Sequence, residues 1–422
     1  MRKLNIKFES EGNTIKTLDY LEKRFFSKKI LNKIKSKKIS KELYFSVPEN
    51  FSLIDNVDKS MLFIKSLFYY RYNMNTNIII DLSKCKNVSM CALFVFDYVL
   101  LMILYEKETL SKKGILNTKI NYTNYIFSDN DKVNKVFVDA GASAYNDNDS
   151  EGFKKYRQHL TTIPLKLFKI RAGDNGRYPN ELIRYLRKKG KVDYISTLDQ
   201  NVQSFINECL DGFGYSLNTD GERVLQKIIS EWKSNCTNHL KDFCEYFCTG
   251  SLTYENNLGI CELVLINFGD TINESIEAKE TTEIGRMTFN KVTEHQRYNS
   301  NFTKENGIVL ASIQKRVSRL KTENNTRGTG FPQIMEFFSK LSDDEENSKM
   351  TIISGKTQIR FAKTDYSRYN KNGEIYFNDE KIPSVLPDMN NVKKIDNQFP
   401  GTIISIRFIF KNEYIEDTKE DN

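Results

Sequence analysis

Residues 260–270 (ICELVLINFGD) contain the clearest strand signal in the C-terminal half of the chain. The run from 260 to 266 is apolar except for Glu262, which is typical of a buried strand. Asn267 follows this strand, and Gly269 stands two residues further on. Because glycine has no Cβ atom, it lets a ligand approach the backbone closely. We therefore expect a sheet with a binding site where this strand ends.

A helix is predicted before this strand, over residues 222–240 (ERVLQKIISEWKSNCTNHL). Glu231 and Asn235 stand four positions apart in it and so lie on one face, one turn apart. A carboxylate at such a place can polarise a water molecule, and an amide oxygen beside it can hold Mg²⁺. The same spacing also arises on any polar helix face, so the pair indicates a site only together with the other motifs of this half of the chain.

Two glycine-containing turns follow the strand. Residues 327–331 (RGTGF) precede a predicted helix over 333–341, where free N–H groups and the positive end of the helix dipole can face a phosphate. Pro400, Gly401 and Thr402 lead into an alternating strand over 403–409 (IISIRFI). The C-terminal half thus presents four candidate ligand-binding elements in a fixed order.

This order resembles the Bergerat-fold, or GHKL, ATPases, which include type II topoisomerases, histidine kinases and mismatch-repair ATPases. That family shows E-x-x-x-N on a helix, a strand with glycine, G-x-G before a helix, and G-T before a strand. The resemblance covers residues 195–412. It implies an α/β sandwich, a mixed sheet with helices on one face, that takes ATP and Mg²⁺ as cofactors. The stretch from 270 to 327 is long enough for the family's ATP lid.

The resemblance also implies a role for each matching residue. Glu231 would activate the hydrolytic water, and Asn235 would bind Mg²⁺. The nucleotide-binding residues would be Asn267, Gly269, Arg327, Gly328, Thr329, Gly330 and Thr402. The family has Asp where Asn267 stands and a second glycine where Thr271 stands. An amide oxygen can accept a hydrogen bond from the adenine amine, but without charge assistance. Nucleotide binding is therefore expected ahead of efficient turnover.

The expected function is a nucleotide-dependent conformational switch in bacterial signalling or defence, with ATPase activity and a protein partner or a second copy of the chain. One alternative is a protein kinase of the anti-sigma-factor type that acts on Ser or His. Another is a non-catalytic module with a degenerate pocket. Arg316, Arg319 and Lys321 precede the G-x-G and either close on the γ-phosphate or form a solvated basic helix.

The N-terminal half alternates predicted strands and helices, which indicates an α/β layer structure. A strand over 77–82 (NIIIDL) precedes a serine-bearing loop and an apolar helix, and residues 40–145 resemble a STAS domain in this arrangement. In that family the loop serine can be phosphorylated, which would correspond to Ser89. A serine directly before an apolar run also commonly caps a helix, and we favour the cap.

Two further groups of residues resemble known sites. Cys236, His239, Cys244 and Cys248 have zinc-like spacing, but on a continuous helix their side chains would be too far apart to converge. We expect these thiols to pack on the sheet instead. His159 and the proline five residues later match the phosphoacceptor box of histidine kinases, without that box's acidic residue and Arg.

Composition places few limits on function. The chain has 422 residues and a net charge of +8, which permits anionic partners without requiring them. Seven cysteines and no signal peptide predict reduced thiols and a cytoplasmic location. Residues 88–104 are apolar, but the run is short for a membrane span and contains Asp97, so we expect a buried helix and no membrane contact.

These signals divide the chain into five segments. We expect a basic segment over 1–41, a STAS-like domain over 42–145, a linker and helical connector over 146–195, a GHKL domain over 196–412 and an acidic tail over 413–422. Residues 21–41 carry nine Lys or Arg against one Glu. They form either an arm that binds nucleic acid or an amphipathic helix with a solvated basic face.

Overall fold

A computed structural model of the chain forms two compact units. One comprises Met1–Ile163 and Asn175–Asp193, and the other Pro164–Asp174 and Tyr194–Asn422. The predicted α/β class is confirmed, since both units combine helices and sheets. The structure describes residues 11–36, 42–73, 76–113, 124–139, 156, 158–163, 165–172, 192–194, 198–211, 214–239, 245–255, 258–277, 290, 298–314, 330–341, 348–409 and 412–417.

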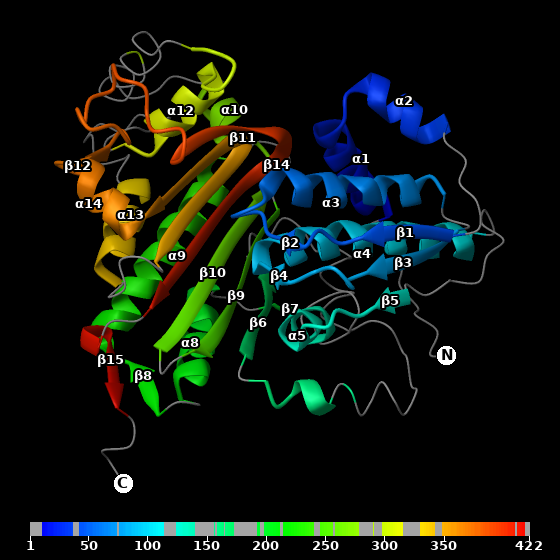
Figure 1. Cartoon of the computed structure of the whole chain (residues 1–422), viewed down its shortest axis with the longest axis horizontal. Coiled ribbons are helices and arrows are strands. Elements are labelled where there is room, and N and C mark those ends of the chain that lie inside the picture. Colours follow the sequence, from blue (N-terminus) through cyan, green and yellow to red (C-terminus); the bar gives the residue numbers. More distant parts are fainter. Residues whose placement is uncertain are drawn as a thin grey trace. The chain divides into compact units, whose positions relative to one another are not determined.

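The first unit is built around a parallel sheet with the strand order β1-β3-β5 (Figure 1). Helices α3 and α4 connect these strands, as parallel strands require a crossover. Its elements are α1 (Glu11–Phe25), α2 (Lys28–Ser36), β1 (Glu42–Ser46), β2 (Asn50–Phe51), α3 (Val57–Arg71), β3 (Asn77–Asp81), β4 (Asn87–Val88), α4 (Met90–Lys112), β5 (Asn124–Ile126) and α5 (Asp131–Asp139).

Helix α4 contains the apolar run that the sequence predicts to be buried. Leu93, Val95 and Val99 lie in the core and are almost fully inaccessible to solvent. Ser89 caps the helix, because its Oγ accepts a hydrogen bond from the N–H of Ala92 at 3.4 Å. The capping role expected of this serine is therefore confirmed. Within the described residues, no helix is both long and apolar enough to cross a membrane.

A buried ion cluster joins three helices of the first unit. Arg71 of α3 donates from Nε and Nη2 to the two carboxylate oxygens of Glu106 in α4, both at 2.9 Å. Its Nη2 also lies 2.8 Å from Asp19 of α1, and its Nη1 lies 3.5 Å from Glu22. Tyr72 donates a hydrogen bond to Glu22. Each buried charge in the cluster thus faces an opposite charge, as a low-dielectric interior requires.

The second unit contains an antiparallel sheet. Its strand order is β11-β14-β10-β9-β6-β7, and the pairings from β11 to β6 are antiparallel. The strands are β6 (Leu165–Ala172), β7 (Val192–Tyr194), β9 (Glu245–Glu255), β10 (Leu258–Phe268), β11 (Lys349–Ala362) and β14 (Val392–Ile409). The shorter strands are β8 (Tyr215–Leu217), β12 (Asn370–Lys371), β13 (Glu374–Ile375) and β15 (Ile415–Asp417).

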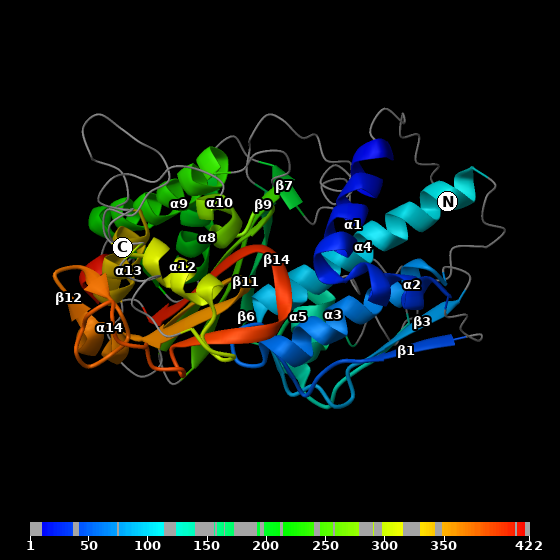
Figure 2. The same cartoon turned by 90° about the horizontal axis from the view of Figure 1, so that it is seen from above.

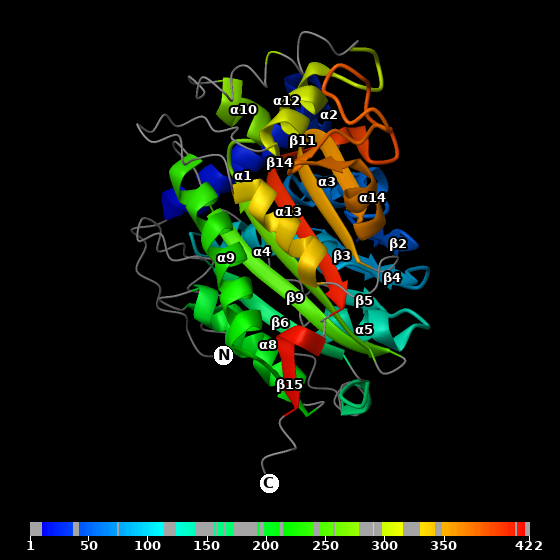
Figure 3. The ribbon, with the colours of Figure 1, turned by 90° about the vertical axis from the view of Figure 1, so that its left-hand side faces the viewer.

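Helices of the second unit cover one face of this sheet, as Figures 2 and 3 show. Trp232 of α9 and Phe338 of α13 share a buried core with Cys261 of β10 and Ile406 of β14. The helices are α8 (Leu198–Asp211), α9 (Thr219–His239), α10 (Ile272–Glu277), α12 (Lys304–Ser312), α13 (Gly330–Leu341) and α14 (Lys363–Tyr369), with a 3₁₀ turn over Asn412–Tyr414.

Two features of this unit differ from the sequence predictions. The segment expected as a linker contributes β6, which pairs with β9, and the expected acidic tail contributes β15, which pairs with β8. The pairings from β11 to β6 are antiparallel, and the expected mixed sheet, which depends on the direction of β7, stays a prediction. Strand partners supply the hydrogen bonds that place these short segments, and local composition does not reveal partners so distant in sequence.

Candidate functional site

Three polar side chains form a row across neighbouring strands of the second unit. Asn267 of β10 is the register partner of Thr402 of β14, which is in turn the partner of Ser354 of β11. Side chains of directly opposed residues lie on the same face of a sheet. By the two-residue alternation this is the face of Leu265, Ile404 and Ile352, which pack against the helices. The row thus continues the apolar core with polar groups at one end of the sheet.

Two glycines bring the backbones close together beside this row. Gly401 has a φ of 149°, and a Cβ atom there would lie 2.0 Å from the carbonyl oxygen of Asn267. Gly269 has a φ of 150°, and its N–H donates to the carbonyl of Pro400 at 3.2 Å. Side chains rarely adopt such φ values, so both positions require glycine. The Gly269 and Gly401 that the sequence singles out therefore have a demonstrable structural role.

Ser354 has more hydrogen-bond partners than the other two side chains of the row. Its Oγ accepts a hydrogen bond from the N–H of Ile272 at 2.8 Å and lies 2.9 Å from Oγ1 of Thr402. It also donates to the carbonyl of Gly401 at 3.3 Å. Ser354 is fully buried, while Asn267 and Thr402 each keep 7% of their surface accessible. The row therefore has a closed end at Ser354 and a partly open end at Asn267.

Thr271, which departs from the family pattern, caps a helix. Its Oγ1 accepts from the N–H of Glu274 at 3.2 Å, and Glu274 Oε2 accepts from the N–H and the hydroxyl of Thr271 at 2.9 and 3.0 Å. This reciprocal arrangement is a capping-box pairing at the start of α10. The sequence analysis missed both Ser354 and Glu274. The spacing T-x-x-E would have indicated the cap, whereas Ser354 is revealed only by strand register.

Helix α9 places two of the predicted residues at the same end of the sheet as the polar row. The helix starts beside Tyr414, because the N–H of Asn218 donates to the Tyr414 carbonyl at 3.1 Å, shortly after β14 ends. Figure 3 shows α9 and β14 running in opposite directions. The C-terminal half of α9, with Glu231 and Asn235, thus lies toward the Thr402 end of β14. The side chains of Glu231 and Asn235 lie outside the described part of the structure.

Several other predicted residues cannot be placed from the described ranges. Gly330 is the first residue of α13, which agrees with a helix after the G-x-G. Six of the predicted residues lie outside the described ranges: Arg316, Arg319, Lys321, Arg327, Gly328 and Thr329. The phosphate-binding turn and the lid cations therefore stay predictions.

The zinc-like cysteines do not lie on one continuous helix. Helix α9 ends at His239, one residue before the predicted end at 240, and β9 begins at Glu245, so the four residues are divided between a helix and a strand. Cys248 lies in β9 and is fully buried in the core, which confirms the expected packing of this thiol on the sheet. Among the residues that the structure describes, no group of His, Cys, Asp and Glu could hold a metal ion.

His159, the candidate phosphoacceptor, lies in the first unit in a surface cluster. Its Nε2 is 2.9 Å from Oδ2 of Asp131, and Tyr156 donates to the other carboxylate oxygen at 3.0 Å. Hydrogen bonds from His159 and Tyr156 lower the pKa of Asp131. Asn134 donates to the Tyr156 hydroxyl at 2.6 Å, so the cluster also stabilises the start of α5. A phosphoacceptor role has no further support in these contacts.

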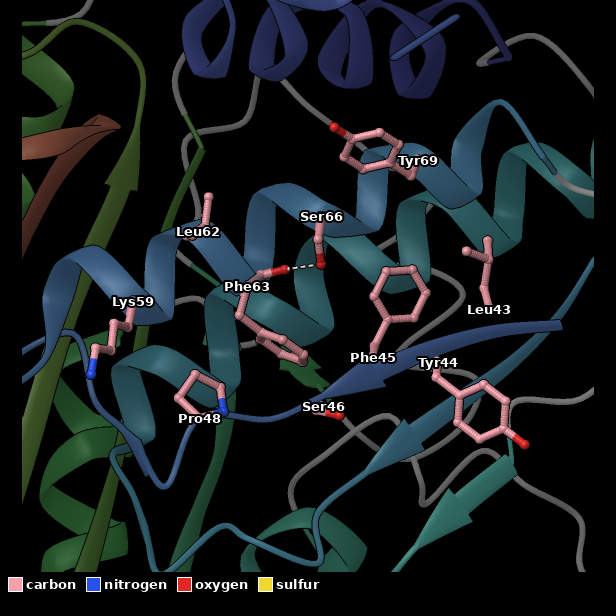
Figure 4. A pocket seen from close by; sticks show the side chains of 10 residues that line it. All are labelled: Leu43, Tyr44, Phe45, Ser46, Pro48, Lys59, Leu62, Phe63, Ser66 and Tyr69. Atoms are coloured by element: carbon pink, nitrogen blue, oxygen red, sulfur yellow. Dashed lines mark hydrogen bonds between the residues drawn. The ribbon is translucent and has the colours of Figure 1, made fainter. Parts of the chain in front are cut away.

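The first unit has a groove of about 410 Å³ beside β1 and α3 (Figure 4). Its walls are mostly apolar and include Phe45, Phe63 and Leu62, with Ser66 donating to the Phe63 carbonyl at 2.6 Å. Leu62 keeps 62% of its surface exposed. None of the predicted nucleotide-binding residues lines this groove.

The basic segment forms part of α1 and α2 within the described ranges. Leu21 and Phe25 are buried, whereas Lys28 and Lys29 are exposed. Lys35 lies over the Tyr72 ring at 5.2 Å from its centroid. The predicted single helix is divided into α1 and α2, and Ile30 keeps 50% of its surface exposed. The buried Leu21 and Phe25 and the exposed lysines agree with a solvated basic face, and nucleic-acid binding stays a prediction.

Comparison of the chain with protein-family models, curated proteins and solved structures finds no match. The functional interpretation consequently depends on residues and geometry. The polar row places hydrogen-bonding groups beside apolar side chains on one face of the sheet. This combination suits a planar heterocycle with polar edges, because apolar contact and a few fixed polar groups orient a ligand.

Proposed function

We propose that the second unit binds Mg-ATP and that the chain is a nucleotide-dependent conformational switch with ATPase activity. The observation that carries this proposal is the row of Asn267, Thr402 and Ser354 on a sheet face that is otherwise apolar. An adenine ring presents a flat apolar surface and an amine edge, which the apolar side chains of this face and the oxygens of Asn267 and Thr402 would complement.

The placement of α9 supports the same proposal. Glu231 and Asn235 occupy the half of α9 that lies toward the polar row. Glu231 would act as the general base for the attacking water, and Asn235 would hold Mg²⁺. The resemblance to GHKL ATPases in the order of four motifs points to the same pair. A switch further requires that closure over the triphosphate changes contacts with another part of the chain or with a partner.

Incubation of the full chain with γ-labelled ATP and Mg²⁺ tests the proposal. We expect release of free phosphate by the wild type and retained ATP binding without release by Glu231→Gln, because the amide cannot accept the proton. Asn235→Ala should weaken binding only in the presence of Mg²⁺. Release that is unchanged in Glu231→Gln would remove this residue from catalysis.

The same experiment distinguishes the alternative functions. Label that stays on the protein would support a kinase, the alternative from the sequence analysis. Absence of both binding and label transfer would support a non-catalytic module and would overturn the proposal.

A further inference from the structure

We propose that Ser354 is a positioning residue that orients the Thr402 hydroxyl and so makes the base site selective for an amine at position 6 of a purine. This inference rests on the proposed nucleotide site. It begins from Ser354, which is fully buried and has three polar neighbours: the N–H of Ile272, the carbonyl of Gly401 and the hydroxyl of Thr402.

A serine hydroxyl has one proton to donate and two lone pairs that accept. The Ile272 N–H must donate, so it occupies one lone pair of Ser354 at 2.8 Å. The carbonyl of Gly401 can only accept, so it takes the single Ser354 proton at 3.3 Å. Oγ1 of Thr402, 2.9 Å away, must then donate to the remaining lone pair. Only this distribution of protons satisfies all three contacts.

The Thr402 hydroxyl is consequently left with lone pairs and no free proton. Within the described part of the chain, Ser354 is its sole side-chain hydrogen-bond partner. A ligand that meets Thr402 must therefore bring a donor. Adenine does so with its exocyclic amine, whereas guanine and hypoxanthine place a carbonyl oxygen at position 6, which would face the Thr402 oxygen without a proton between them.

This arrangement has a consequence for Asn267. A carboxamide can present either its oxygen or its NH₂ group, so Asn267 alone selects neither base. Thr402 is its register partner and lies on the same face. Because the Thr402 hydroxyl can only accept a hydrogen bond from the ligand, a bound amine is held best when Asn267 also presents its oxygen. Ser354 thereby compensates for the lost aspartate of the family pattern.

Competition binding of ATP and inosine triphosphate to the full chain tests this inference, because the two nucleotides differ at the position-6 group and its adjacent ring proton. We expect the wild type to bind ATP more tightly than inosine triphosphate. In Ser354→Ala this preference should be about tenfold smaller, because the Thr402 hydroxyl can then rotate and donate a hydrogen bond. Ser405→Ala is the matched control. Ser405 is also buried in the sheet, but its hydroxyl has no hydrogen-bond partner among the described residues, and it stands on the opposite face.

A second variant keeps the test decisive if Ser354→Ala fails to fold. Thr402→Val preserves shape and removes the acceptor, so ATP should bind about tenfold more weakly while inosine triphosphate is unaffected. An unchanged nucleotide preference in Ser354→Ala, or unchanged ATP affinity in Thr402→Val, would overturn the inference and leave the proposed function standing. Failure of the wild type to bind either nucleotide would instead overturn the proposed function.

Discussion

The two units contain buried polar groups of different kinds. In the first unit Arg71 contacts three carboxylates, and Ser60 both donates to and accepts from the backbone of Ser52 at 3.1 and 3.0 Å. In the second unit Ser354 is equally saturated, but the neighbouring Thr402 and Asn267 keep hydrogen-bonding capacity and some accessible surface. Polar groups that satisfy one another stabilise a fold, whereas groups that keep both hydrogen-bonding capacity and some accessible surface indicate a place for a ligand.

This comparison predicts the largest effect at Arg71. Arg71→Met should destabilise the first unit by about 3–5 kcal/mol, because Glu106 and Glu22 would lose their counter-charge inside the protein. Urea denaturation measures the change. Arg368→Met in the second unit is the matched control, since Arg368 and Asp379 form an equally short ion pair of 2.7 Å with both side chains largely exposed. A control as damaging as Arg71→Met would contradict the distinction between buried and exposed pairs.

The next effect concerns the backbone that shapes the proposed site. Gly401→Ala should cost the second unit about 2–3 kcal/mol, because φ is 149° and the new methyl group would meet the Asn267 carbonyl oxygen. Thermal denaturation measures the loss, and nucleotide binding should disappear with it. Wild-type stability in this variant would show that β10 and β14 can separate at Gly401 without cost.

Two buried serines, one in each unit, allow a hydrogen-bonded hydroxyl to be compared with a hydroxyl that has no partner among the described residues. Ser60→Ala should destabilise the first unit by about 1–3 kcal/mol, because the Ser52 N–H and carbonyl would lose their partner. Ser405→Ala should be close to neutral, since no described group bonds to this hydroxyl. Equal losses in the two variants would mean that volume, and not hydrogen bonding, determines the cost.

The sequence predicted some elements of the fold and missed others, and the reason is physical. Strands β3 and β10 and helix α4 were predicted because each carries a predominantly apolar run, broken only by Glu262 in β10 and Asp97 near the middle of the run in α4. Strands β9 and β11 were not, since polar residues and Gly355, at the β11 bulge, interrupt their patterns. Gly269, Asn267 and Thr402 were selected as site residues from local motifs. Ser354 was missed because its role depends on register between strands that lie far apart in the sequence.

The smallest predicted effect is a pH dependence of the first unit. Burial raises the pKa of the Cys85 thiol from about 9 to about 11. Below pH 9 the thiol is protonated in both the folded and the unfolded chain, so its contribution to stability is fully present. Between pH 9 and pH 11 the unfolded thiol releases its proton and the folded one does not. Stability should therefore fall as pH rises through this window.

Cys85→Ala isolates this contribution from that of the buried tyrosines, whose pKa values burial also raises, as at Tyr70. We expect urea denaturation to show that wild type loses about 1.3 kcal/mol more than the variant between pH 8 and pH 10. Alkylation of the folded protein at pH 9 gives a second reading, since only the thiolate reacts and Cys85 should stay unmodified. Rapid alkylation, or an identical pH dependence in the variant, would show that the thiol is not held neutral by its apolar surroundings. Cys85 Sγ lies 3.4 Å from the Asn87 carbonyl, which is a weak contact, in the same unit as the hydrogen-bonded Ser60 hydroxyl. A protected thiol would show that this unit also keeps a weakly bonded group away from solvent.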